Sequence, residues 1–210
     1  MSGRVSKILA IVAIWISFAS CAALAPRADP SSYYILGTHP EADFAADKNS
    51  AGSKDISSVG LGPIELPGYL DRQQIATRTS TNRLSYSEND RWAAPLSESF
   101  SRVLAQNISH LLDPARVIQF PWQSHDAPDY QVKIEVLQFE GNSNQQAWLT
   151  ARWTVIDRNK KIMVGQRSQL HRRAASLATE DSVKALSETL GELSREIVET
   201  LLAFDKPGKT

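Results

Sequence analysis

Residues 130–171 place the strongest constraint on the fold, because apolar and polar side chains alternate there through three consecutive runs. A period of two is typical of strands that bury one face and expose the other. The turn-forming stretch 157–161 separates the second run from the third. The segment therefore predicts a meander of three antiparallel strands over residues 130–139, 147–156 and 162–171. In the middle run one face carries Leu149, Ala151, Trp153 and Val155, and the other carries Trp148, Thr150, Arg152 and Thr154.

A helix is expected ahead of this meander. Apolar residues recur at helical spacing from Leu96 to Leu112. Asn89 or Asp90 can cap the start of the helix, and the Asp-Pro pair at residues 113–114 ends the pattern. An amphipathic helix of this kind is expected to bury its apolar stripe against the sheet.

A second helix is expected near the end of the chain, where an apolar stripe runs from Val183 to Leu201. Thr179 is its expected N-cap, because the acidic residues that follow suit the positive end of the helix dipole. The order of elements predicts an α+β fold, with a mainly antiparallel sheet and two main helices packed on one face. Further short strands are expected within residues 32–36, 59–65, 75–78, 83–86 and 117–120.

The N-terminal residues are typical of a secretory signal peptide. Arg4 and Lys7 are the only charged residues ahead of an apolar run at residues 8–18. This run is about half of the roughly 20 apolar residues that a spanning helix needs, which disfavours a permanent membrane span. Residues 1–20 are therefore expected to be removed.

Cys21 is the only cysteine in the chain. Residues 18–21, Phe-Ala-Ser-Cys, resemble the bacterial lipobox, which implies that the Cys21 sulfur is acylated and that Cys21 begins the mature protein. The alternative is a buried free thiol in an uncleaved anchor. The lipobox is preferred, because a lone cysteine directly after an apolar leader is otherwise unusual in an exported chain. Ala22 follows in place of the Asp that resembles an inner-membrane retention signal, which implies the outer membrane.

Residues 21–32 are expected to form the lipidated cysteine and a tether, since they contain small residues and two prolines without a periodic apolar face. Fully extended, the tether spans at most about 40 Å. A partner anchored in the inner membrane would therefore have to reach toward this protein. A single domain is expected over residues 33–204, followed by a C-terminal tail at 205–210.

The sequence contains no recognisable set of catalytic, metal-binding or cofactor-binding residues. Its four histidines are scattered, and none stands at helical spacing from another ligand. Nucleophile-elbow and phosphate-loop sequences are missing. Without Arg4 and Lys7, 21 of the 23 basic residues remain against 23 acidic ones, which argues against nucleic acid as a partner. We therefore expect a protein that is not an enzyme and binds no cofactor or metal.

Residues 60–78, which we call the signature segment, combine glycines and prolines with charged residues and glutamines. Composition alone is explained by a strand, a Pro-Gly turn, a short helical turn and another strand. In that interpretation Arg72 and Arg78 are solvated charges without a special role.

A resemblance supports a more specific interpretation. Residues 62–78, followed by Arg91-Trp92 and Pro95-Leu96, resemble the signature of the ABC-type transport auxiliary lipoproteins, the PqiC/YmbA-like family. The similarity extends from about residue 21 to the final helix. By this match, the expected partner-binding residues are Tyr69, Asp71, Arg72, Gln74, Arg78, Arg91 and Trp92.

The resemblance implies an outer-membrane lipoprotein that faces the periplasm and works with an MCE-domain protein of an inner-membrane ABC transport system. Such systems move phospholipid or other hydrophobic molecules, so the chain would be a docking component held in the outer membrane by the lipid on Cys21. The alternative is a stand-alone lipid carrier that uses Trp122, Trp148 and Trp153, although aromatic residues in a meander are more often core. Exposed strand edges permit a homo-oligomer without requiring one.

Overall fold

The computed structural model describes residues 29–38, 56–112, 116–123, 125 and 127–204. Cys21, the predicted signal peptide at residues 1–20, most of the tether and the predicted tail at residues 205–210 lie outside the described residues. The compact unit that carries the fold begins at Ser31.

The predicted meander is confirmed and forms one side of the sheet, with β8 at the edge. β6 (Tyr130–Asn142), β7 (Gln146–Asp157) and β8 (Ile162–Arg173) pair in antiparallel order. The predicted buried face of β7 is also confirmed, since its four apolar residues are at most 1% exposed. These residues are Leu149, Ala151, Trp153 and Val155.

The remaining strands extend the sheet from the other edge of β6. β2 (Ser58–Glu65) pairs in parallel with the first half of β6, and β3 (Gln74–Ser80) pairs in parallel with its last residues. β5 (Arg116–Gln119) lies parallel to β2, whereas β4 (Arg83–Trp92) lies antiparallel to β3. β1 (Ser32–Tyr34) adds to β4 in parallel. The sheet is mixed, but its longest ladders are antiparallel, as predicted.

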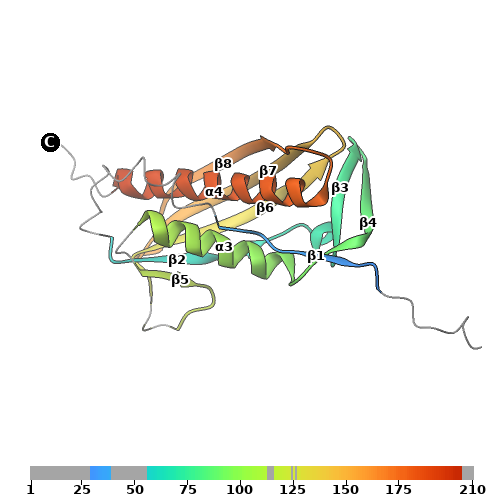
Figure 1. Ribbon diagram of the computed structural model, residues 1–210. Coiled ribbons are helices and arrows are strands. Elements are labelled where there is room, and N and C mark those ends of the chain that lie inside the picture. Colours follow the sequence, from blue (N-terminus) through green and yellow to red (C-terminus); the bar gives the residue numbers. More distant parts are fainter. Residues whose placement is uncertain (1–28, 39–55, 113–115, 124, 126, 205–210) are drawn as a thin grey trace, which may run out of the picture. The chain divides into compact units, whose positions relative to one another are not determined.

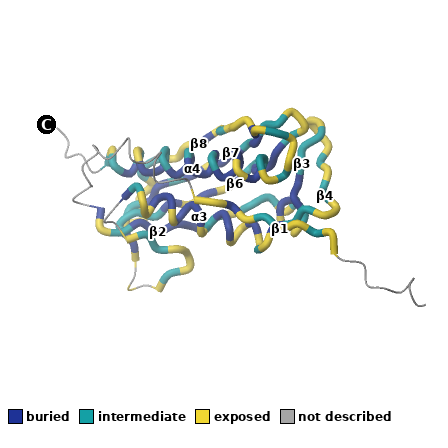
Figure 2. Tube along the Cα trace, in the orientation of Figure 1, coloured by how far each residue is buried: buried dark blue, intermediate teal, exposed yellow. Residues whose placement is uncertain are grey.

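The two helices α3 (Leu96–Leu111) and α4 (Thr179–Phe204) lie side by side on one face of the sheet (Figure 1). Their inward stripes and the facing side of the sheet are buried (Figure 2). Phe100 of α3 meets Phe139 of β6 edge to face, with ring centroids 5.2 Å apart. The predicted α+β class is therefore confirmed. Neither of these described helices is both long and apolar enough to cross a bilayer.

The predicted helix caps are wrong. Neither Asn89 nor Asp90 begins α3, because β4 continues through the buried Trp92 and α3 starts only after Pro95. Asp90 stays in the strand because β1 pairs with β4 at this position. Thr179 is the first residue of α4, and its hydroxyl donates to Asp90 Oδ2 at 2.6 Å instead of capping its own helix.

Candidate functional site

The first glycines of the signature segment serve close packing. A Cβ on Gly60 would lie 2.5 Å from Pro128 Cγ and 2.8 Å from the Trp122 ring. Gly62 has a φ of 114°, a backbone conformation that other residues rarely adopt. This part of the signature is therefore explained by the close packing of β2 against Phe120, Trp122 and Pro128.

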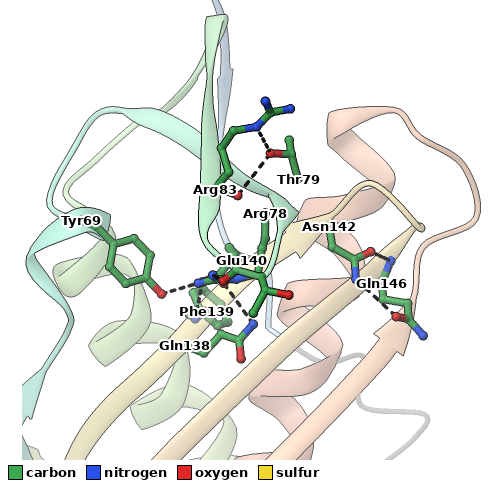
Figure 3. Close-up of polar contacts among 10 residues, drawn as sticks. Tyr69, Arg78, Thr79, Arg83, Gln138, Phe139, Glu140, Asn142 and Gln146 are labelled. Carbon is green, nitrogen blue, oxygen red and sulfur yellow. Dashed lines mark hydrogen bonds and ion pairs between the residues drawn. The ribbon is translucent and has the colours of Figure 1, made fainter.

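The middle of the signature segment is held to the sheet by a buried carboxylate. Tyr69 lies in the short 3-10 helix η3 (Gly68–Leu70), and its hydroxyl donates to Glu140 Oε2 at 2.7 Å. Arg78 of β3 donates from Nε to Glu140 Oε1 at 2.6 Å, and the Gln138 side chain donates to the same oxygen at 3.0 Å. Figure 3 shows Tyr69, Arg78 and Gln138 converging on Glu140. We call these four residues the Glu140 lock.

The Glu140 lock provides hydrogen-bond donors for a buried carboxylate that would otherwise destabilise the fold. Glu140 is 1% exposed, and an unpaired carboxylate there would strongly destabilise the fold. Burial, together with the hydrogen bond to Glu140, raises the pKa of Tyr69 well above its ordinary value. Burial alone would lower the pKa of Arg78, but the hydrogen bond to Glu140 outweighs it and raises that pKa. Tyr69 and Arg78 therefore stay protonated and fix the signature segment in place.

We expect Tyr69→Phe to lower the free energy of unfolding by about 2 kcal/mol, because it removes a hydrogen bond to a charged group. The pKa of Tyr69 is higher in the folded chain than in the unfolded chain, so its contribution is complete below about pH 10 and is lost as the pH rises further. Urea unfolding between pH 8 and 11 would show a shallower alkaline loss in Tyr69→Phe than in the wild type. Tyr33→Phe, at a residue that is 60% exposed, is the matched control and should keep the wild-type slope. Equal slopes in wild type and Tyr69→Phe would contradict the prediction.

Beyond the lock, the signature segment presents an exposed turn. Asp71, Arg72 and Gln73 are all exposed, and we call them the exposed signature turn. The Arg72 guanidinium carbon lies 4.9 Å from the centre of the Tyr86 ring, and the Tyr86 hydroxyl donates to the Tyr69 carbonyl at 3.1 Å. Tyr86 thus contacts the turn through Arg72 and through the Tyr69 carbonyl, while Asp71 and Arg72 remain exposed.

The other predicted binding residues lie in the β3–β4 pair. Gln74 and Arg91 are register partners and half-buried. Trp92 is 6% exposed and belongs to the core, and its backbone amide donates to the Gln73 carbonyl at 2.7 Å. The structure therefore brings the seven predicted residues into one region, but only Asp71 and Arg72 are exposed among them.

Sequence reasoning missed Glu140 and Gln138. Both lie after a register shift in the β6–β7 ladder between Val136 and Gln138, which breaks the simple alternation of the strand. The shift itself leaves no signal in the sequence. The run Phe-Glu-Gly at residues 139–141 gave only one hint, a charged residue beside the end of an apolar strand.

A groove of about 1350 Å³ lies between one side of α4 and the stretch formed by β1 and the residues that follow it. It combines the exposed Tyr33 and Ile35 with cations and carboxylates of α4, including Lys184, Glu188 and Arg195. Within the described part of the chain, no group of three or more His, Cys, Asp or Glu side chains is placed to hold a metal ion.

Comparison with known proteins agrees with this architecture. The model of a family described as "ABC-type transport auxiliary lipoprotein component" matches residues 41–198. A crystal structure of an uncharacterized protein is 19% identical, with 81% of this chain and 98% of that chain covered and a TM-score of 0.67. A DUF330 protein from Xanthomonas campestris is 15% identical, with 85% and 100% covered and a TM-score of 0.66. At these identities the two structures show the shared fold alone. No curated protein matches the chain significantly.

Proposed function

The chain belongs to the family of ABC-type transport auxiliary lipoproteins, and from that premise we propose that it is a non-catalytic docking component of an intermembrane transport system. Its partner in this proposal is an MCE-domain protein of an inner-membrane ABC system that moves lipid or another hydrophobic molecule. The acylated Cys21 holds it in the outer membrane, facing the periplasm.

The observation that carries the proposal is the contrast between the Glu140 lock and the exposed signature turn. A loop that only connects two strands does not require a buried carboxylate with three side-chain donors beneath it. Such a support holds the exposed charges of Asp71 and Arg72 in a fixed position. Fixed charged groups favour specific contact with a partner, because less side-chain and loop entropy is lost on binding.

The short tether is consistent with this arrangement. Its reach of at most about 40 Å keeps the domain close to the membrane that holds the lipid on Cys21. Several acyl chains hold a protein stably on a bilayer where one chain would not. In the proposed assembly the inner-membrane partner therefore extends across most of the space between the two membranes.

The test is capture of the partner by variants of the exposed signature turn. Asp71→Arg and Arg72→Glu reverse exposed charges, so we expect each to reduce co-purification of the MCE-domain protein at least tenfold while the thermal midpoint changes little. Arg83→Glu is the matched control, because Arg83 is also exposed and lies on the nearby β3–β4 hairpin. Full recovery of the partner with both turn variants would contradict the docking role of the turn.

The carrier alternative receives less support from the positions of the three tryptophans. Trp153 is buried in the core, where its Nε1 donates to the Ser168 hydroxyl at 2.9 Å. Trp148 stands on the opposite face of β7, and Trp122 packs over Gly60. The three rings therefore do not line one common cavity. Lipid co-purifying at close to one molecule per chain would favour the carrier over the docking component.

A further inference from the structure

The face of the meander that points away from the helices carries many exposed side chains, although Thr150 and Glu140 on the same face are buried. Register pairing places Lys133, Thr154 and Gly165 in one row, and Glu135, Arg152 and Arg167 in the next. Residues directly opposite each other project from the same face of a sheet. The following rows carry Gln138, Thr150 and Gln169, then Glu140, Trp148 and His171, and Arg173 lies opposite Gln146.

This face carries an excess of positive charge. Lys133, Arg152, Arg167 and Arg173 are all exposed, and we call these four residues the basic sheet face. Glu135 is the exposed carboxylate among them, and it pairs with Arg152 at 3.2 Å. No ion pair among the described residues engages the other three cations.

The helix side of the domain differs from this face in its charge. The exposed and half-buried charged residues of α4 are mainly acidic, and its two cations are Lys184 and Arg195. The excess of cations on the meander is thus not matched on α4. A one-sided distribution of this kind orients a protein against an anionic partner.

An aromatic pair lies at one end of the basic sheet face. The Trp148 ring stacks on His171 with centroids 4.8 Å apart and an interplanar angle of 22°. Trp148 is half-buried, so its ring is partly open on the same face as the cations. Tryptophan beside basic residues is the combination favoured where a protein meets lipid headgroups, because indole has an apolar body and a polar edge.

We propose that the basic sheet face, with Trp148 at its end, binds the headgroups of anionic phospholipids in the membrane that anchors the chain. The proposal rests on the lipid anchor of the proposed function, since a tether of at most about 40 Å keeps this face within reach of the bilayer surface. Lipid is favoured over an acidic protein segment because the cations are spread over three strands and accompanied by an indole. Contact of this face with the membrane leaves the helices, which lie on the opposite face of the sheet (Figure 1), available to a partner.

The test uses the chain from residue 21 with Cys21→Ser, so that binding to vesicles reports the domain without its acyl chains. This chain contains the whole compact unit that begins at Ser31, including its core. It would be sedimented with vesicles of phosphatidylethanolamine and phosphatidylglycerol, and with vesicles of phosphatidylcholine alone. We expect binding to the anionic vesicles only, and a steep loss of binding as salt rises from 50 to 300 mM.

The deciding variant is the double substitution Arg167→Gln and Arg173→Gln. A basic side chain near an anionic surface contributes roughly fivefold to binding, so we expect the double variant to bind at least tenfold more weakly. The matched control is Arg102→Gln with Lys184→Gln, which removes two exposed cations from the helices and should leave binding unchanged. Equal loss in both double variants, or binding to an acidic peptide without binding to vesicles, would overturn the proposal. Partner capture in detergent does not depend on this face, so its outcome tests the docking function separately.

Discussion

Glu140→Ala is expected to lower the free energy of unfolding by about 3 to 4 kcal/mol, one of the two largest effects we predict. Removing one member of a buried charged cluster leaves its partners unpaired, which costs about 3–5 kcal/mol. Here the substitution removes the carboxylate that accepts from the Tyr69 hydroxyl and from Arg78 Nε. Urea unfolding at neutral pH measures the change.

The control for Glu140→Ala is Glu135→Ala in the same strand. Glu135 also pairs with an arginine, but the side chains of Arg152 and Glu135 are 59% and 50% exposed. Exposed pairs contribute about 0.2–1 kcal/mol, so we expect a small effect. A loss below about 1 kcal/mol for Glu140→Ala would show that the lock does not support the signature segment.

Trp153→Ala is expected to cost about 4 kcal/mol, because replacing a fully buried large aromatic residue by alanine leaves a cavity. Trp153 is 1% exposed, and the substitution also removes its hydrogen bond to Ser168. At this magnitude a large part of the stability of an ordinary domain is lost. Thermal and urea unfolding would show the change directly.

Trp148→Ala is the matched control, since it removes the same side chain from the same strand on the opposite face. We expect a cost of about 1 kcal/mol, because the Trp148 ring is half-buried and stacks on the exposed His171. Equal costs for the two substitutions would contradict the assignment of faces, on which the basic sheet face also depends.

Periodicity predicted the meander and both helices because their residues bury one face against a common core. It could not predict which strands pair with β6, since β2 and β3 share one of its edges in parallel and no local pattern specifies that partner. The start of α3 was misplaced because Asp90 is a good capping residue by type, whereas pairing with β1 keeps it in β4.

The sequence predicted part of the candidate site, but not which of its residues are turned inward and which are exposed. Sequence alone treats Tyr69, Asp71, Arg72 and Arg78 alike, as polar residues of one segment. The structure turns Tyr69 and Arg78 inward to Glu140 and leaves Asp71 and Arg72 exposed. That difference depends on a carboxylate about 60 residues away in the chain, which no local pattern connects to the signature segment.

The central claim is that the chain docks a transport assembly, and affinity capture of the full-length acylated protein tests it most directly. The protein would be captured from detergent-solubilised envelopes and its co-purifying proteins and lipids identified by mass spectrometry. We predict recovery of an MCE-domain protein together with its ABC transport subunits. Recovery of lipid without any transport protein would contradict the docking function and support the carrier in its place.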